Sequence, residues 1–181
     1  MKIVLSILLF CSVLLADRDG GPYLGLGYGV SKYDDDSVYK EQKVSDSASL
    51  LFYGGAYINR HLSVELGYVG FNTRNAYTVI DDTNKEKSLS LSSFNISTLA
   101  HYAFFDDILD FYAKFGVGEV SVSGEGESGF TMIYGGGIGV RFNERLSMKI
   151  AYDRYMIEYN KERAKHEMHI DFIYSAFEVQ F

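Results

Sequence analysis

The sequence predicts an all-β protein, an eight-stranded antiparallel up-and-down transmembrane β-barrel. Three observations lead to this prediction. The 181 residues include 15 tyrosines, 13 phenylalanines and 18 glycines but one proline, a composition typical of strands rather than helices. Apolar residues alternate with small or polar ones along most of the chain. The segments between the alternating runs are long and short in turn, as in a barrel with tight turns at one rim and longer loops at the other.

The N-terminal segment is expected to be a targeting signal. Lys2 precedes an apolar run at residues 3–15, and Ala16 is followed by charged residues. This is the pattern of a secretory signal peptide, and the run is shorter than the roughly 20 residues that a membrane-spanning helix needs. We therefore expect residues 1–16 to be removed and residues 17–181 to form the barrel domain. Cys11, the only cysteine, would leave with the signal peptide.

The first half of the remaining chain contains four alternating runs. Residues 23–33 alternate leucine, tyrosine and valine with glycine and serine. Residues 48–58 fit a second strand, and in residues 62–71 leucine, valine and tyrosine oppose serine, glutamate and glycine. Residues 88–104 form the fourth run, with phenylalanine, isoleucine and tyrosine on one face. Each run has the period of two that a strand requires.

The second half contains four more runs. Residues 109–123, 130–142 and 146–159 each place leucine, phenylalanine, isoleucine or methionine opposite glycine, serine or single charges. The last strand ends the chain, where phenylalanine and valine alternate with glutamate and glutamine. The tight turns are expected at residues 59–61, 105–107 and 143–145, and the longer connections at residues 34–47, 72–87, 124–129 and 160–165.

The two faces of the strands predict which solvent surrounds the barrel. An eight-stranded lumen is only just wide enough for side chains. Small residues and paired charges would fill it, whereas a full set of phenylalanines and tyrosines would overpack it. The apolar face is therefore expected to point into lipid, with a soluble barrel of reversed faces as the alternative. The charges expected to face inward and to pair across strands are Glu65, Lys114, Arg141, Lys149 and Asp153.

A family resemblance rests on four motifs and the C-terminal aromatic residue: YLGLGY at residues 23–28, LSVELGY at 62–68, YAKFGVG at 112–118, YGGGIGVRF at 134–142, and Phe181. With these, the chain resembles the small outer-membrane β-barrel proteins of Gram-negative bacteria, a porin-like group that includes opacity-type and OmpA-barrel-type proteins. The resemblance implies an outer-membrane location, periplasmic termini and long loops outside the cell. It also implies that the barrel-assembly machinery reads the last strand through Phe177, Val179 and Phe181. The group shares a fold rather than one activity, so function does not transfer.

One constellation raises the question of catalysis. His61, Ser63 and Glu65 fall on one face of the third expected strand. The His-x-Ser spacing is similar to that of outer-membrane lipid A deacylases, and a histidine base beside a serine nucleophile is chemically sensible. However, His61 falls in a tight turn and no other deacylase motif is present. We therefore interpret these residues as a turn histidine and two lumen-lining side chains.

Two patterns raise the question of a metal. His166 and His169 are one residue closer than in the zinc motif His-Glu-x-x-His, and on a strand they point to opposite faces. The aspartates at 34–36 and 81–82 fall in long loops, where carboxylates usually serve solvation but can also hold a divalent cation loosely. The sequence predicts neither a metal site nor a cofactor.

The leading functional hypothesis is a non-enzymatic outer-membrane barrel with surface-exposed loops, which serves surface interactions and the strength of the envelope. The alternatives are a narrow channel for small solutes or apolar molecules and a lipid-modifying enzyme. The expected partners are outer-membrane lipid and lipopolysaccharide, the barrel-assembly machinery, and an extracellular ligand bound by the loops. The formal charge of −7 argues against nucleic acid.

Overall fold

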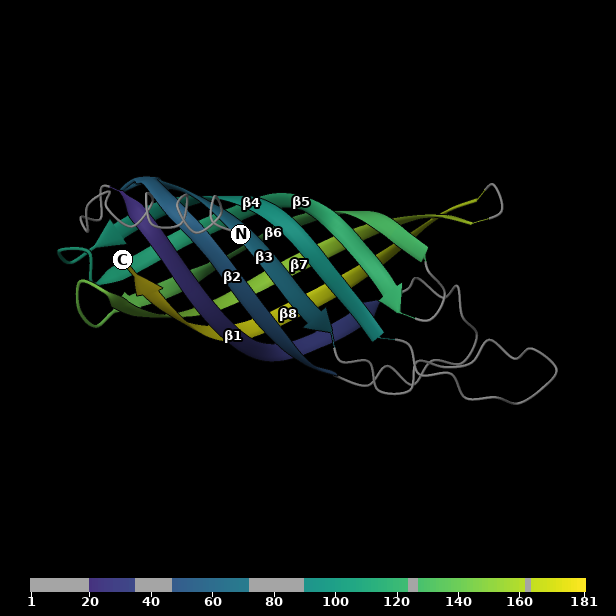
Figure 1. Ribbon diagram of the computed structural model, residues 1–181, viewed down its shortest axis with the longest axis horizontal. Helices are drawn as coiled ribbons and strands as arrows, with labels where there is room; N and C mark the ends of the chain where they lie inside the picture. Colours follow the sequence, from purple (N-terminus) through teal and green to yellow (C-terminus); the bar gives the residue numbers. More distant parts are fainter. Residues whose placement is uncertain (1–19, 35–46, 72–89, 124–126, 162–163) are drawn as a thin grey trace, which may run out of the picture.

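The computed structural model describes residues 20–34, 47–71, 90–123, 127–161 and 164–181. These residues form a closed barrel of eight antiparallel strands, in which each strand pairs with its neighbours in the chain and the first pairs with the last (Figure 1). The strands are β1 (Gly21–Asp34), β2 (Ser47–Asn59), β3 (Leu62–Phe71), β4 (Ser90–Phe104), β5 (Leu109–Ser123), β6 (Glu127–Arg141), β7 (Leu146–Lys161) and β8 (Ala164–Gln180). The predicted fold class is confirmed.

The barrel closes between β1 and β8. Their register runs from Tyr23 opposite Gln180 to Asp34 opposite His169. Past the end of β8, the backbone N–H of Phe181 donates to the carbonyl oxygen of Pro22 at 2.9 Å. Closure of this kind leaves no strand edge unpaired in lipid. The described residues include no helix long and apolar enough to cross a membrane.

The strand boundaries agree with the predictions in the apolar parts of the chain. Some strands continue beyond their predicted ends, and there the sequence is polar. β3 and β5 have the expected bounds. β6 begins at Glu127 rather than Phe130, and most of the loop expected at residues 160–165 is strand, with Lys161 opposite Ala164. Hydrophobic alternation marks only the part of a strand that contacts lipid, whereas ladder hydrogen bonds continue beyond it. In Figure 1 the β7–β8 hairpin extends past the other strands at the rim opposite the chain's C-terminus.

The orientation of the two faces is as predicted. Leu66 on β3 is 49% exposed, whereas its neighbour Glu65 is 3% exposed and faces the lumen. The same alternation holds on β1, where Leu24 and Leu26 are exposed and Tyr23 is buried. The outer surface is therefore a band of leucine, isoleucine, valine and aromatic side chains, and the soluble alternative with reversed faces does not apply.

The contents of the lumen differ from the prediction. Small residues and paired charges were expected to fill the lumen, but eight aromatic side chains are also buried inside: Tyr23, Tyr53, Tyr57, Phe71, Tyr112, Tyr155, Phe172 and Tyr174. Glycines on adjacent strands make room for some of the rings. A Cβ atom at Gly25 would lie 2.0 Å from Cζ of Tyr53, and one at Gly55 would lie 2.4 Å from Cζ of Tyr23. These rings occupy the space that side chains at Gly25 and Gly55 would need.

Candidate functional site

The middle of the lumen holds a buried lysine between two carboxylates. Lys114 of β5 donates to Oε1 of Glu65 at 2.9 Å and to Oδ2 of Asp153 at 3.1 Å. The hydroxyl of Tyr174 donates to the same oxygen of Asp153 at 3.1 Å, and the hydroxyl oxygen of Tyr23 lies 3.5 Å from Oε2 of Glu65. The three charged side chains are at most 4% exposed. Since burying a lone charge is costly, this arrangement offsets much of that cost and ties β3, β5 and β7 together across the lumen.

A second buried lysine forms its own cluster. Lys149 of β7 makes an ion pair with Glu178 of β8, and its Nζ atom lies 5.1 to 5.3 Å from the ring centroids of Tyr23, Tyr53 and Tyr112. At this distance an ammonium group is attracted to the faces of the rings. The sequence prediction included Lys149 but missed Glu178. The alternation that turns Phe177 and Val179 outward also turns Glu178 inward, so the signal was present.

Arg141, the remaining residue of the predicted charge network, lies at the mouth of the lumen. It is half-buried at the end of β6, and its Nη2 atom donates to Oε1 of Gln180 at 3.4 Å. This mouth belongs to the rim that holds the end of β8, which we call the terminal rim (Figure 1). The predicted network is therefore divided in space. Glu65, Lys114 and Asp153 form one cluster, while Lys149 and Arg141 lie in separate contacts.

A third polar cluster joins β3, β4 and β5 near the terminal rim. The Oγ atom of Ser63 lies 2.8 Å from Nε2 of His101, and Nδ1 of His101 lies 2.8 Å from Oδ2 of Asp110. His61, the histidine considered from the sequence, is exposed in the turn, and its Nδ1 atom lies 3.4 Å from the carbonyl oxygen of His101. The sequence prediction missed His101 and Asp110, because they are adjacent to Ser63 only through strand register.

The half of the lumen toward the opposite rim holds a cluster of apolar side chains beside buried serines, Asn95 and Thr131. The ring of Phe71 lies edge-on to those of Tyr155 and Phe172, at centroid distances of 5.3 and 6.1 Å. Aliphatic side chains at most 1% exposed surround these rings, namely Val69, Val120, Ile133, Ile157 and Ile170. We call these eight residues the apolar plug. Together with the other buried side chains, the polar clusters and the apolar plug fill the described lumen.

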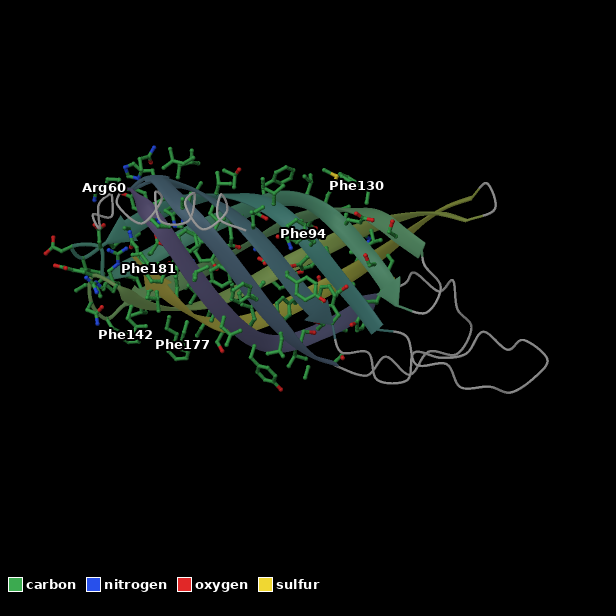
Figure 2. The ribbon with its side chains drawn as sticks, viewed as in Figure 1. Arg60, Phe94, Phe130, Phe142, Phe177 and Phe181 are labelled. Carbon is green, nitrogen blue, oxygen red and sulfur yellow. The ribbon has the colours of Figure 1, made fainter. Side chains whose placement is uncertain are left out.

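The outer surface carries exposed aromatic residues toward both ends of the barrel. Figure 2 shows Phe142, Phe177 and Phe181 toward the terminal rim and Phe130 toward the opposite end. The predicted assembly segment is exposed on this outer face, with Phe177 at 56%, Val179 at 40% and Phe181 at 51%. Aromatic rings at these levels suit the two interfaces of a bilayer.

A charged cluster limits the apolar band on β7 and β8. Arg154 donates to both carboxylate oxygens of Asp171, at 2.5 and 2.8 Å, and the hydroxyl of Tyr152 donates to Oδ1 of Asp171 at 2.6 Å. Lys32 of β1 lies directly opposite Asp171 in the strand register. Charges on the lipid-facing surface are tolerated near the interface and not at the bilayer centre, so this level marks one edge of the membrane-spanning band.

The metal patterns considered from the sequence fall largely outside the described residues. Residues 35–36 and 81–82 and the side chain of His166 are not described. Within the described ranges, no group of three or more histidine, cysteine, aspartate or glutamate side chains is arranged to hold a metal ion.

Comparison with known proteins agrees with the geometry of the barrel. The model of the family "Outer membrane protein beta-barrel domain" matches residues 3–180. The chain belongs to this family. This outer-membrane β-barrel is therefore a component of the Gram-negative envelope. No curated protein sequence matches it significantly.

Solved structures share the fold at low sequence identity. Neisserial surface protein A has a TM-score of 0.68 and 14% identity, over 89% of this chain and 97% of that chain. The attachment invasion locus protein Ail of Yersinia pestis, solved in complex with the heparin analogue sucrose octasulfate, has a TM-score of 0.57 and 13% identity, over 90% and 99% of the two chains. OprG from Pseudomonas aeruginosa has a TM-score of 0.50 and 12% identity, over 92% and 99%. At such identities the likeness establishes the fold alone.

Proposed function

We propose that this outer-membrane β-barrel presents its extracellular connections for surface interactions and strengthens the envelope. The observation that carries the proposal is the filled lumen. Lys114 is held between two buried carboxylates, and Phe71, Tyr155 and Phe172 pack together in the apolar plug. A barrel filled in this way contributes its outer surface and its loops rather than a passage. The role needs no catalytic centre, and the filling favours it over the narrow channel.

The direction of the barrel follows from its termini. In the family arrangement the chain ends are periplasmic, so we assign the terminal rim to the periplasm. The connections at residues 35–46, 72–89, 124–126 and 162–163 join strands at the opposite rim and would face outward from the cell. Export through the signal peptide at residues 1–16 and insertion by the barrel-assembly machinery would place the chain in this direction.

Lipopolysaccharide is the partner we propose for the outer edge of the apolar band. Lys32, Asp171 and Arg154 lie side by side on β1, β8 and β7. The row carries two cations and one anion at the level where the apolar surface ends. Lysine and arginine at such a level can reach phosphate groups of the surrounding lipid.

The surface role is tested with cells that display the protein. Adhesion of these cells to immobilised heparin and to extracellular-matrix proteins is compared with that of cells carrying an empty vector. A variant with residues 76–85 replaced by glycine and serine tests the β3–β4 connection, and Arg145→Gln, in the exposed turn between β6 and β7 at the terminal rim, serves as the matched control. We expect adhesion above the vector level, reduced in the loop variant and retained in the control. Adhesion at the vector level on every surface would contradict the surface role.

A further inference from the structure

The cluster of Ser63, His101 and Asp110 has the hydrogen-bond order of a catalytic triad. Nδ1–H of His101 donates to the Asp110 carboxylate, which leaves Nε2 to accept the proton of the Ser63 hydroxyl, each over 2.8 Å. A serine hydroxyl paired in this way with an oriented imidazole is an activated nucleophile, whatever fold carries it. The surface role proposed above does not use this cluster.

The surroundings hold the three side chains in place. The rings of Tyr57 and Tyr112 flank the imidazole of His101, with centroids 5.1 and 5.8 Å from it. The hydroxyl of Tyr23 donates to Oγ of Ser63 at 3.3 Å. A hydroxyl donor beside the nucleophile is a group that can stabilise the negative oxygen formed when a carbonyl is attacked. Nucleophile, base and orienting carboxylate are therefore present, with a hydroxyl donor beside the nucleophile.

The location of the cluster determines which molecules can reach it. Ser63 follows the first residue of β3, and Asp110 follows the first residue of β5, so both are close to the terminal rim. The Asp110 side chain is 11% exposed, whereas Ser63 is fully buried. Solvent therefore reaches one end of the cluster from this rim. Because Ser63 and His101 are buried, the substrate class that this cluster could take is limited to small, uncharged molecules.

We infer that Ser63 is a nucleophile for small acyl esters that enter from the terminal rim. Ser63 Oγ attacks the ester carbonyl carbon, and its proton passes to His101 and then to the alkoxide that leaves as the ester C–O bond breaks. Water then attacks the acyl-serine, transfers a proton through the same imidazole and releases the carboxylic acid, which restores Ser63. His101 acts as general base and acid, and Asp110 is a positioning residue.

The test measures covalent labelling of the folded barrel in detergent micelles by a small alkyl fluorophosphonate. Attack by Ser63 forms a P–O bond and expels fluoride, and peptide mass spectrometry locates the adduct. We expect labelling at Ser63 that disappears in Ser63→Ala and slows about 100-fold in His101→Gln, the scale of general-base catalysis. Asp110→Asn should lower the maximal labelling rate about tenfold or more and leave the half-saturating probe concentration unchanged. Ser97→Ala, which removes another buried lumen serine, should label like the wild type.

Heat-modifiable migration on a gel confirms that each variant is folded before it is labelled. Asp110→Glu, which keeps the carboxylate, should recover part of the rate lost in Asp110→Asn. No adduct at Ser63 in the folded wild-type barrel, or an adduct that forms at the same rate in folded His101→Gln, would overturn the inference. Neither result bears on adhesion, so failure here and failure of the surface role are distinguishable.

Discussion

The ring of Tyr53 on β2 lies over Gly25 on β1, its direct partner in the strand register. Two residues along β1, Tyr23 faces Gly55 in the same way. Each tyrosine occupies the lumen space that a side chain on the opposite strand would need. Pairs of this kind allow a narrow lumen to hold large rings and still close, and they fix the register of β1 against β2.

The Gly25–Tyr53 pair gives the first prediction. A methyl group at Gly25 would lie 2.0 Å from Cζ of Tyr53, so Gly25→Ala should lower the free energy of unfolding by about 1–3 kcal/mol through overpacking. In Gly25→Ala/Tyr53→Ala the clash is gone, so the double variant should lose less than the sum of the single losses. Urea unfolding of barrels refolded in detergent measures this cycle. Gly70→Ala is the control, because nothing lies within 4 Å of its added Cβ. An equal loss at Gly70, or additive losses in the cycle, would contradict this account of the pair.

The sequence predicted correctly those features that depend on one strand alone, such as whether a side chain faces the lumen or the lipid. Alternation correctly turned Leu62, Val64 and Leu66 outward, and it turned Glu65 and Lys114 inward. These assignments need only a period of two and the knowledge that lipid lies on the outside.

The sequence was less informative about side-chain contacts that depend on the register between two strands. The contact between Ser63 and His101 depends on the register of β3 against β4, and the contact with Asp110 depends on the register of β4 against β5. The room for Tyr53 depends in the same way on a glycine of another strand. A single sequence without the register does not reveal such pairs, which is why the tyrosine-filled lumen and the serine–histidine pair were not predicted.

The second prediction concerns the buried lysine of the lumen. Lys114→Met leaves Glu65 and Asp153 facing each other without a cation, so the free energy of unfolding should fall by about 3–5 kcal/mol. Glu65→Gln/Lys114→Met/Asp153→Asn removes all three charges and should recover most of that loss. Urea unfolding in detergent is the measurement, and Lys32→Met on the exposed face is the control. If Lys114→Met lowered the free energy of unfolding no more than Lys32→Met does, the ion-paired network would not stabilise the barrel as we predict.

The third prediction concerns the tight turn between β4 and β5. Phe105, Asp106 and Asp107 all have positive φ angles, 53°, 53° and 68°, which are costly for residues other than glycine. Asp106→Gly relieves that cost and should raise the free energy of unfolding by about 1 kcal/mol. Glu144→Gly, in the turn between β6 and β7, is the control. No described residue of that turn has a positive φ, so glycine should bring no gain there. Equal effects at the two positions would show that backbone strain is not the cause.

The fourth prediction concerns assembly in cells. Phe181 is exposed beside the site of barrel closure, where its N–H bonds to Pro22. We expect deletion of Phe181 to lower the amount of assembled barrel in cell envelopes far more than it lowers the stability of barrels refolded in detergent. Heat-modifiable migration on gels measures both, and Phe142→Ala removes an exposed aromatic of the same rim as the control. An equal loss in both preparations, or no loss in the envelopes, would reject a role in assembly.

The filled lumen is the central claim, and electrical recording from the purified barrel in a planar bilayer tests it most directly. The lumen is filled at one level by the ion pairs of Lys114 with Glu65 and Asp153. It is filled at another level by the packed rings of Phe71 and Phe172. The account predicts small or no steady conductance. Large and stable single-channel steps, comparable to those of a general porin, would contradict it.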